Sequence, residues 1–331
     1  MRPMRPNRTA FSWSDQREPH AERRRRMLQQ YPQIKELYGP CGRTKYVCIA
    51  LVLAQLSLAY GLRDAPWWLL LLVAYAVGGV INQALLLAIH ELSHNLAFRK
   101  PWHNRAFAMF VNLPIGVPLA ETFRYYHLLH HTHQGDERLD TDLPTEFEGR
   151  MLQHTVTKLI WLTGQGLAYA LRPLFVHPKK PSSVELLNLA LQLAFNLVIF
   201  YFWGGKALAY LPVSTLLVMG LHPIAGHFIS EHYVFRDGQE TYSYYGPLNA
   251  LAFNVGYHNE HHDFPYVAGS RLARLRATAP EFYDTLYAHR SWAATLWRFV
   301  TEPQLGGYSR VKRRAANDPN KPSAASSAAD D

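Results

Sequence analysis

Long apolar segments separated by polar stretches set the pattern of this chain, and four of them are long enough to cross a bilayer as helices. They cover residues 46–62, 67–89, 184–203 and 207–228. Short turns join the first segment to the second at residues 61–66 and the third to the fourth at residues 204–206. The pattern therefore predicts an all-α integral membrane protein whose four transmembrane helices form two hairpins.

The rest of the chain is more polar and divides into several regions. Two further apolar segments, residues 104–120 and 155–176, are interrupted by Asn, Pro, Lys or Arg, so we expect them to be interfacial or re-entrant. A basic region covers residues 1–45 and precedes a membrane domain at 46–314. The last segment, residues 315–331, is rich in Ala, Ser, Asp and Pro and is predicted to be disordered.

The positions of Lys and Arg predict which side of the membrane each polar stretch faces. Of the 34, residues 1–45 carry 11, residues 90–183 carry 10 and residues 229–331 carry 11, whereas each hairpin turn carries one. By the positive-inside rule, both termini and the long middle segment are predicted to be cytoplasmic. The net charge of +9 is not accompanied by a basic and aromatic recognition module, so no nucleic-acid partner is expected. Cys41 and Cys48 do not form a disulfide framework pattern.

Three dense histidine blocks lie on the predicted cytoplasmic side. They are His90 and His94, then His127, His130 and His131, then His258, His261 and His262. Residues four apart share one face of a helix, so His90 and His94 can converge on one metal ion, and each H-x-x-H-H block presents its first histidine beside both later ones. Eight ligands are too many for a four-coordinate zinc ion and suit two metal ions. Imidazole alone leaves iron, copper, nickel and zinc open.

Other histidines lie near the end of the fourth predicted span. We expect His232 to be a ninth ligand because it falls where the chain leaves the membrane, with His227 as the second choice and His222 behind it. The isolated histidines are interpreted as ordinary surface or packing residues; they are His20, His103, His154, His177 and His289. Residues beside the third block could orient ring nitrogens, or could only cap and pack the local helix; they are Asn254, Tyr257, Asn259 and Glu260.

Two other functions compete with an oxygen-using metal site. Residues 90–94 match the H-E-x-x-H pattern of zinc proteases, in which the glutamate is the general base, and would indicate an intramembrane metalloprotease. That reading leaves the six histidines of the other two blocks largely without a role. A membrane-bound scaffold held by its basic arm would leave all eight unexplained.

Several stretches resemble the integral-membrane fatty acid desaturase and hydroxylase superfamily, and most closely its sphingolipid Δ4-desaturases (dihydroceramide desaturases). The residues that carry the resemblance are the three histidine blocks, 11–35, 112–118, 222–232, 240–249 and 253–265, the last reading Phe-Asn-Val-Gly-Tyr-His-Asn-Glu-His-His-Asp-Phe-Pro. The resemblance covers residues 11 to about 314. It implies a cytoplasmic helical cap holding a di-iron site, with the block histidines as ligands and no catalytic residue beyond them.

The resemblance also implies the reaction and the partners. The expected reaction uses O2 to desaturate dihydroceramide at C4–C5 of the sphingoid base, giving ceramide with a trans double bond. Hydroxylation at C4 of the same lipid, or desaturation of another acyl lipid, remains an alternative. Electrons would come from NAD(P)H through a separate reductase and cytochrome b5, or through a ferredoxin if the source is bacterial. The membrane would be that of the endoplasmic reticulum in a eukaryote and the inner membrane in a bacterium.

Overall fold

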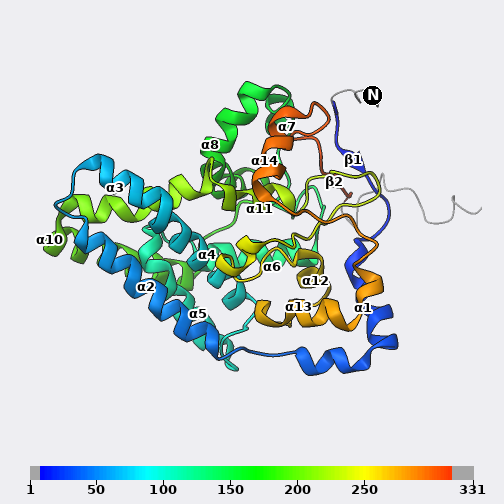
Figure 1. Cartoon of the computed structure of the whole chain (residues 1–331), viewed down its shortest axis with the longest axis horizontal. Helices are drawn as coiled ribbons and strands as arrows, with labels where there is room; N and C mark the ends of the chain where they lie inside the picture. The colour runs from blue at the N-terminus through cyan, green and yellow to red at the C-terminus, as the bar shows by residue number, and fades with distance from the viewer. Residues whose placement is uncertain (1–7, 315–331) are drawn as a thin grey trace, which may run out of the picture.

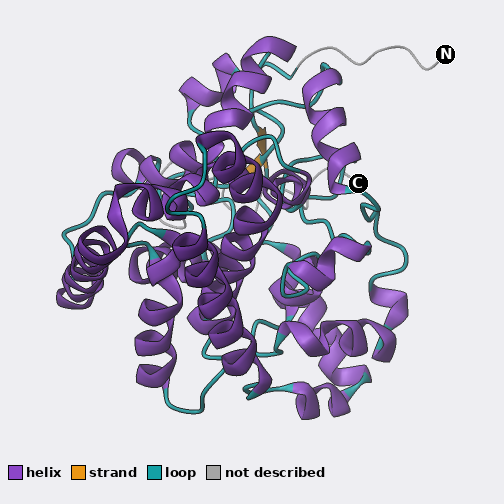
Figure 2. Ribbon diagram, turned by 60° about the vertical axis from the view of Figure 1, so that its left-hand side comes forward, coloured by secondary structure: helices purple, strands orange, loops and turns teal. Residues whose placement is uncertain are grey.

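The computed structural model describes residues 8–314, and helices dominate it (Figures 1 and 2). Long helices extend to one side, and a lobe of shorter elements, called the polar lobe below, lies on the other side (Figure 1). Within the described residues, three helices are long and apolar enough to cross a membrane: α2 (Arg43–Gly61), the continuous helix Trp67–Ser93 and α10 (Ser183–Met219). The second consists of α3 (Trp67–Val73), a π-helical turn η2 (Ala74–Gly78) and α4 (Gly79–Ser93).

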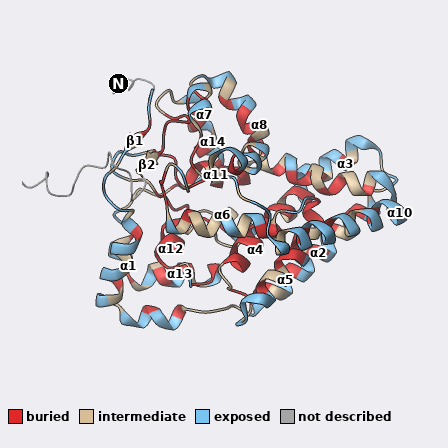
Figure 3. Cartoon of the chain, turned by 180° about the vertical axis from the view of Figure 1, so that it is seen from behind, coloured by how far each residue is buried: buried red, intermediate tan, exposed pale blue. Residues whose placement is uncertain are grey.

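The outer faces of these helices are exposed (Figure 3), and large apolar side chains lie on them. Large exposed side chains on them include Leu53, Trp68, Leu72, Leu197, Phe200 and Phe202. A soluble protein rarely exposes so large a continuous apolar surface, whereas lipid solvates it favourably. The helices α2 and Trp67–Ser93 confirm the first predicted hairpin as a pair of apolar helices, and the chain is an integral membrane protein.

The helix α10 is broken into two antiparallel limbs at Gly204, which has a positive φ of 85°. Asn196 donates a hydrogen bond to the carbonyl of Gly116 (3.2 Å), and the ring of Pro212 packs against the same glycine. In a straight helix Asn196 and Pro212 would lie about 24 Å apart, so both can reach Gly116 only because the chain turns back. The tip is tied to the first hairpin by a hydrogen bond from Lys206 to the carbonyl of Ala65 (2.8 Å).

The second limb of α10 ends at Met219, so the prediction of a helix to residue 228 was wrong. Gly220 has non-helical backbone angles (φ −89°, ψ −132°), and Pro223 has no N–H to continue the helical ladder. Residues that look like the end of the span instead form η4 (Pro223–Ala225) and α11 (Gly226–Ser230). The apolar composition continues past these residues, so hydropathy alone did not show where the helix ends.

The apolar segment at 104–120 is not a straight span. It contains α5 (Pro101–Asn112) and η3 (Leu113–Ile115), and the axis then bends by 116° into α6 (Ala120–Thr132). Asn112 Oδ1 accepts hydrogen bonds from the N–H groups of Leu119 (3.0 Å) and Ala120 (2.8 Å), which caps the start of α6. A bent pair of this kind is either a broken span or a re-entrant loop, so the bend agrees with the re-entrant interpretation.

The segment at 155–176 belongs to the polar lobe. It forms α8 (Thr155–Leu171) and α9 (Pro173–Val176), and α8 packs on α14 (Trp292–Thr301) through Trp161 and Phe299. It is not among the helices long enough to span a membrane. The remaining elements of the polar lobe are β1 (Ser12–Trp13), α1 (Pro19–Gln30), η1 (Pro32–Leu37), α7 (Glu146–Met151), η5 (Pro247–Leu251), α12 (His258–Asp263), α13 (Gly269–Thr278), η6 (Pro280–Phe282) and β2 (Val311–Lys312).

The two ends of the described chain meet in the polar lobe. Strands β1 and β2 pair in parallel, with Ser12 opposite Val311. Helix α1 packs against α12, which carries the third histidine block. The N-terminal region is therefore integrated into the lobe that holds the histidines. The predicted disordered tail at 315–331 lies outside the described residues.

Candidate metal centre

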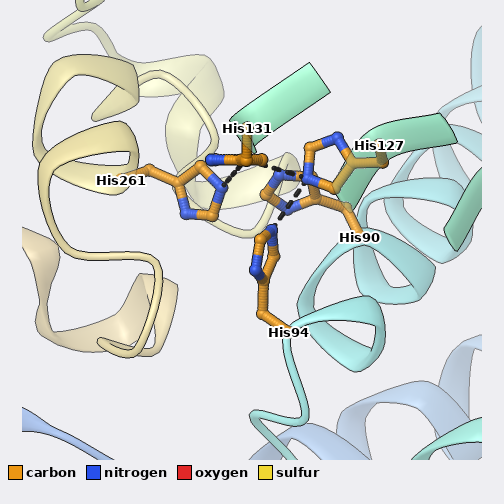
Figure 4. A group of neighbouring side chains, drawn as sticks. All are labelled: His90, His94, His127, His131 and His261. Carbon is orange, nitrogen blue, oxygen red and sulfur yellow. Dashed lines mark hydrogen bonds between the residues drawn. The ribbon is translucent and has the colours of Figure 1, made fainter. Parts of the chain in front are cut away.

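Five histidines from three segments converge to form a first group (Figure 4). Their ring nitrogens all lie within 4.8 Å of one another, and the members are His90, His94, His127, His131 and His261. The first lies on α4, the second caps its C-terminus, the next two lie one turn apart on α6, and the last lies on α12. The i, i+4 spacing of two pairs thus directs both members of each pair to one point, as the sequence predicted.

The imidazoles of this group meet through their Nε2 atoms. His127 Nε2 lies 2.8 Å from His94 Nε2 and 3.1 Å from His131 Nε2, which in turn lies 3.1 Å from His261 Nε2. Within residues 8–314, the buried Nε2 of His90 has no hydrogen-bond partner. Facing lone pairs repel unless a proton or a cation lies between them, and each neutral imidazole has only one proton. The arrangement therefore suits a metal ion at the centre.

A second group lies beside the first. It contains His130, His232 and His262, whose nitrogens also lie within 4.8 Å of one another. His258 joins it through His232, because the two Nε2 atoms are 2.9 Å apart. The rings of His131 and His262 stack with centroids 4.2 Å apart, so the two groups are neighbours. All nine histidines predicted as first choices therefore lie in two adjacent clusters that could each hold a metal ion.

Asp140 fixes the orientation of one ring in the second group. Its Oδ1 lies 2.9 Å from His130 Nδ1, so the ring donates its Nδ1–H to the carboxylate and keeps the Nε2 lone pair for a metal. The other oxygen of Asp140 accepts the N–H of Gly135 (2.7 Å). Sequence reasoning missed Asp140, because nothing in the run Asp136 to Asp142 distinguishes one carboxylate from another.

Burial keeps four of the nine histidines in their neutral form. It lowers the pKa values of His232, His258, His261 and His262 well below 6.5, with the neighbouring imidazoles lowering them further. Neutral imidazole is the form that binds a metal. The ring nitrogens are thus available for coordination at neutral pH without prior loss of a proton.

His227 lies outside both groups, and its ring nitrogens have protein partners. Nδ1 lies 3.0 Å from Glu231 and Nε2 lies 2.7 Å from the side-chain amide of Gln83. The second-choice ligand is therefore a hydrogen-bonding residue in this structure. His222 accepts the N–H of Ile224 and caps η4. Of the histidines interpreted as ordinary, His20 is buried and packs on His262, with ring centroids 4.9 Å apart.

The polar residues beside the third block hold α12 in place instead of orienting rings. Glu260 accepts hydrogen bonds from Ser243 Oγ (2.7 Å) and Tyr245 OH (2.6 Å), and Asn259 donates to the carbonyl of Thr241 (3.0 Å). Burial raises the pKa of Glu260 to about 7, although both hydroxyls act in the opposite direction. Asn254 adopts a left-handed conformation before the helix, and Tyr257 is the residue at its N-terminus.

Replacing Asp140 with alanine is expected to weaken metal binding by about 10- to 100-fold, because His130 loses the partner that fixes its tautomer and ring orientation. Competition with a chromophoric chelator would measure the affinity. Asp284→Ala is the matched control, since that carboxylate forms an exposed ion pair with Arg276 away from the histidines. Equal affinities in the two variants would contradict the role assigned to Asp140.

Comparisons with known proteins show which sequences this chain is similar to. The profile of the family described as "Fatty acid desaturase" matches residues 66–294, and that of "Sphingolipid Delta4-desaturase (DES)" matches residues 7–43. A "Sphingolipid delta(4)-desaturase DES1" from Drosophila melanogaster is 52% identical over 310 residues, which cover 93% of this chain and 97% of the relative. A "Sphingolipid delta(4)-desaturase/C4-monooxygenase DES2" from Rattus norvegicus is 52% identical over 309 residues, which cover 93% and 96%. A DES1-like relative from Oryza sativa is 50% identical over 307 residues, which cover 93% and 94%.

Proposed function

Because the chain belongs to the sphingolipid Δ4-desaturase family and is an oxidoreductase, we propose that it desaturates dihydroceramide at C4–C5 with two histidine-bound iron ions. The observation that carries this proposal is the pair of adjacent all-imidazole groups near the C-terminal end of α4, of which the first is partly buried and the second is buried. The substrate class follows from the near full-length similarity to relatives named for this activity.

The residues present fit two iron ions. The group of His90, His94, His127, His131 and His261 would hold one ion, and His130, His232, His258 and His262 would hold the other. The buried Nε2 atoms of His90 and His262, which have no partner in the part of the chain that the structure describes, are donor atoms of the kind a metal satisfies. When bound, iron with O2 and two electrons supplies an oxidant able to take hydrogen from an unactivated methylene group.

The protein's own residues position this chemistry and shield it. Histidines from α4, α6 and α12 fix the ion positions, while Asp140 orients His130. Side chains packed around α4 keep bulk water from the first group, since His90 and the residues preceding it are buried. The balance is that dihydroceramide loses two hydrogens while O2 takes up two electrons and two protons, which gives ceramide and two waters.

Hydroxylation at C4 is the second candidate, because one relative of 52% identity is named as both desaturase and C4-monooxygenase. Hydroxylation consumes the same O2, two electrons and two protons. One oxygen atom then stays on the lipid as the hydroxyl group, and the other leaves as water. A zinc protease has less support for two reasons. Glu91, which would be the general base, already accepts the N–H of Gly269 at its Oε1 (2.9 Å). Histidines of the other two blocks also lie beside His90 and His94.

The polar lobe would face the cytoplasm, as the distribution of Lys and Arg indicates. In a eukaryote that would be the cytoplasmic face of the endoplasmic reticulum, and in a bacterium that of the inner membrane. Electrons from NAD(P)H would arrive there through a reductase and cytochrome b5, or through a ferredoxin. The basic residues of the N-terminal region could steer an acidic carrier to this lobe.

The test is mass spectrometry of the sphingoid base after membranes containing the protein receive labelled dihydroceramide, NADH, O2 and a cytochrome b5 reductase system. A product lighter by two hydrogens at C4–C5 supports the proposal, and a product heavier by one oxygen supports C4-hydroxylation. Oxidation of another acyl lipid alone would overturn the substrate. Two irons and negligible zinc per chain would exclude the protease.

Removing iron is expected to destabilise the protein, because the folded chain binds the metal and the unfolded chain does not hold the two groups together. At a thousandfold excess of free metal over Kd, the loss on removal is about 4 kcal/mol. Thermal unfolding in detergent, before and after chelation, would measure it. Restoration of the Tm by Fe²⁺ is the control, and an unchanged Tm after complete chelation would contradict metal binding at this buried site.

A further inference from the structure

A row of buried polar side chains leads from helix α4 to the second histidine group. Gln83 lies on α4 about two turns before His90, and its Nε2 is 2.7 Å from His227 Nε2. The other ring nitrogen of His227, Nδ1, is 3.0 Å from Glu231 Oε1. The same carboxylate oxygen lies 3.7 Å from Nδ1 of His258, a member of the second group. Gln83 is 1% exposed, His227 3% and the side chain of Glu231 15%, so the row is largely shielded from bulk water.

His227 has one tautomer that satisfies both of its neighbours. The amide N–H of Gln83 donates to Nε2, so this nitrogen carries no proton and the proton of the ring lies on Nδ1. The Nδ1–H group then donates to Glu231. His227 is therefore a donor that holds this carboxylate beside His258, which gives it a role although it lies outside both histidine groups.

His258 needs a hydrogen-bond acceptor that Glu231 can supply. Its Nε2 faces the second group, 2.9 Å from His232 Nε2. A neutral ring that offers Nε2 to a metal ion carries its proton on Nδ1, and this buried atom of His258 has no hydrogen-bond partner among the residues that the structure describes. Metal-bound histidines usually donate that proton to a carboxylate or a carbonyl. The 3.7 Å separation from Glu231 is too long for a hydrogen bond, but a small side-chain rotation would close it.

We propose that Glu231 is a positioning residue of the second group. It accepts the Nδ1–H of His258 when a metal ion is bound, and its hydrogen bond with His227 holds it in place. Asp140 plays the same part for His130 in this group, at 2.9 Å. The contact fixes the tautomer and the ring orientation of His258, so that its Nε2 lone pair points to the ion. That the ion is iron rests on the proposed function, whereas the positioning does not.

The first test is structural. A high-resolution cryo-EM map of the metal-loaded protein should place Glu231 Oε1 within hydrogen-bond distance of His258 Nδ1, at about 2.7–3.2 Å. A separation that stays too long for a hydrogen bond would overturn the proposal, and so would a different acceptor on this nitrogen. The map does not depend on turnover, so this test holds even if the substrate has been assigned wrongly.

The second test measures the affinity of each of the two metal ions. Glu231→Ala is expected to weaken one ion by about 10- to 100-fold and to change the other much less. Titration of the metal-free protein with Co²⁺ against a chromophoric chelator measures both affinities, and the absorption bands of bound Co²⁺ report the ligand geometry. Glu231→Gln keeps the size of the side chain and an acceptor oxygen, so it should bind the weakened ion more tightly than Glu231→Ala. Equal affinities in these two variants would overturn the role of Glu231 as an acceptor.

A second variant tests the row from its other end. Gln83→Leu removes the donor that fixes the tautomer of His227, and we expect it to weaken the same ion by about tenfold. Gln165→Leu is the matched control, because Gln165 is a buried glutamine whose amide donates to the carbonyl of Met219 (2.7 Å). This control should leave both Co²⁺ affinities unchanged. An equal loss in the two glutamine variants would overturn the proposal, since the cause would then be general loosening.

Glu148→Ala is the control for the loss of a buried carboxylate, because Glu148 pairs with Arg172 (2.7 Å) and not with a histidine. It should lower the Tm without changing either Co²⁺ affinity of the folded protein. A loss of metal affinity as large as that of Glu231→Ala would mean that any buried carboxylate has this effect, and the positioning role would be wrong.

The outcomes separate this inference from the proposed function. If the wild type makes no oxidised sphingoid base, the proposed function fails, whereas the Co²⁺ affinities still test the role of Glu231. If the wild type makes ceramide and Glu231→Ala binds both Co²⁺ ions as tightly as the wild type, the positioning role is wrong and the function stands.

Discussion

A His131→Ala variant is expected to lose at least about a hundredfold of its desaturation activity, since weakening a partner of a metal ligand alone costs 10- to 100-fold in affinity or activity. The ring of His131 takes part in the first group through His127 and His261, and it stacks on His262 of the second group. Its removal therefore takes one imidazole from the first group and one ring contact from the second group. We expect the iron content to fall from two ions toward one or fewer.

The measurement combines metal analysis of the purified variant with the sphingoid-base assay. His103→Ala is the control, because His103 is exposed on α5 and contacts only the ring of Phe98 among the aromatic residues described around it. The control should keep two irons and the turnover of the wild type. A His131→Ala protein that retained both would show that the convergence of these rings has a purely structural cause.

The convergence of the nine histidines could be predicted from the sequence because its signals are local. Histidines four apart share a helix face, and counting Lys and Arg placed all three blocks on one side of the membrane. The structure brings these eight residues and His232 together in two adjacent groups. Distinguishing His232 from His227 required more, because the partners of His227 are Gln83 and Glu231, and Gln83 lies 144 residues away.

The end of the fourth apolar segment was harder to predict for a different reason. Leu221, Ile224 and Phe228 continue the apolar composition beyond Met219, so hydropathy alone extends the helix. The backbone at Gly220 and the missing N–H of Pro223 end it nine residues earlier than residue 228. Average hydrophobicity reports what solvates a segment, whereas the hydrogen-bonding capacity of its backbone decides where the helix ends.

His20 shows what periodicity cannot detect. It is one isolated histidine in a basic arm, yet its Nδ1 lies 2.7 Å from Asp263, 243 residues away, and its Nε2 lies 2.9 Å from Thr241 Oγ1. Arg23, three residues later, binds the same carboxylate and also Asn259 (2.9 Å). The sequence placed this arginine run in a basic region that only precedes the membrane domain, but Arg23 is largely buried against the helix of the third block.

Arg23→Ala is expected to destabilise the polar lobe by about 3 kcal/mol, the lower part of the range for breaking a buried ion pair, because His20 remains as a second partner. Asp263 is completely buried, and Arg23 Nε lies 2.6 Å from its Oδ2. Burial disfavours the charge of Asp263, but Arg23 and His20 together hold its pKa below the ordinary value of 3.8. The stabilisation is therefore present above about pH 4 and is lost as the pH falls through the lower pKa of the folded protein.

Thermal unfolding in detergent would measure the loss, and metal analysis would show its consequence for α12. This helix carries His258, His261 and His262, so we expect the Arg23→Ala protein to bind iron less tightly even where it remains folded. Arg25→Ala is the matched control from the same arginine run, because Arg25 pairs with Glu22 in solvent. It should leave both the Tm and the iron content unchanged. Equal Tm values for the two variants would mean that Arg23 covers the third block without stabilising it. His20 would then be the only partner through which Asp263 contributes to stability.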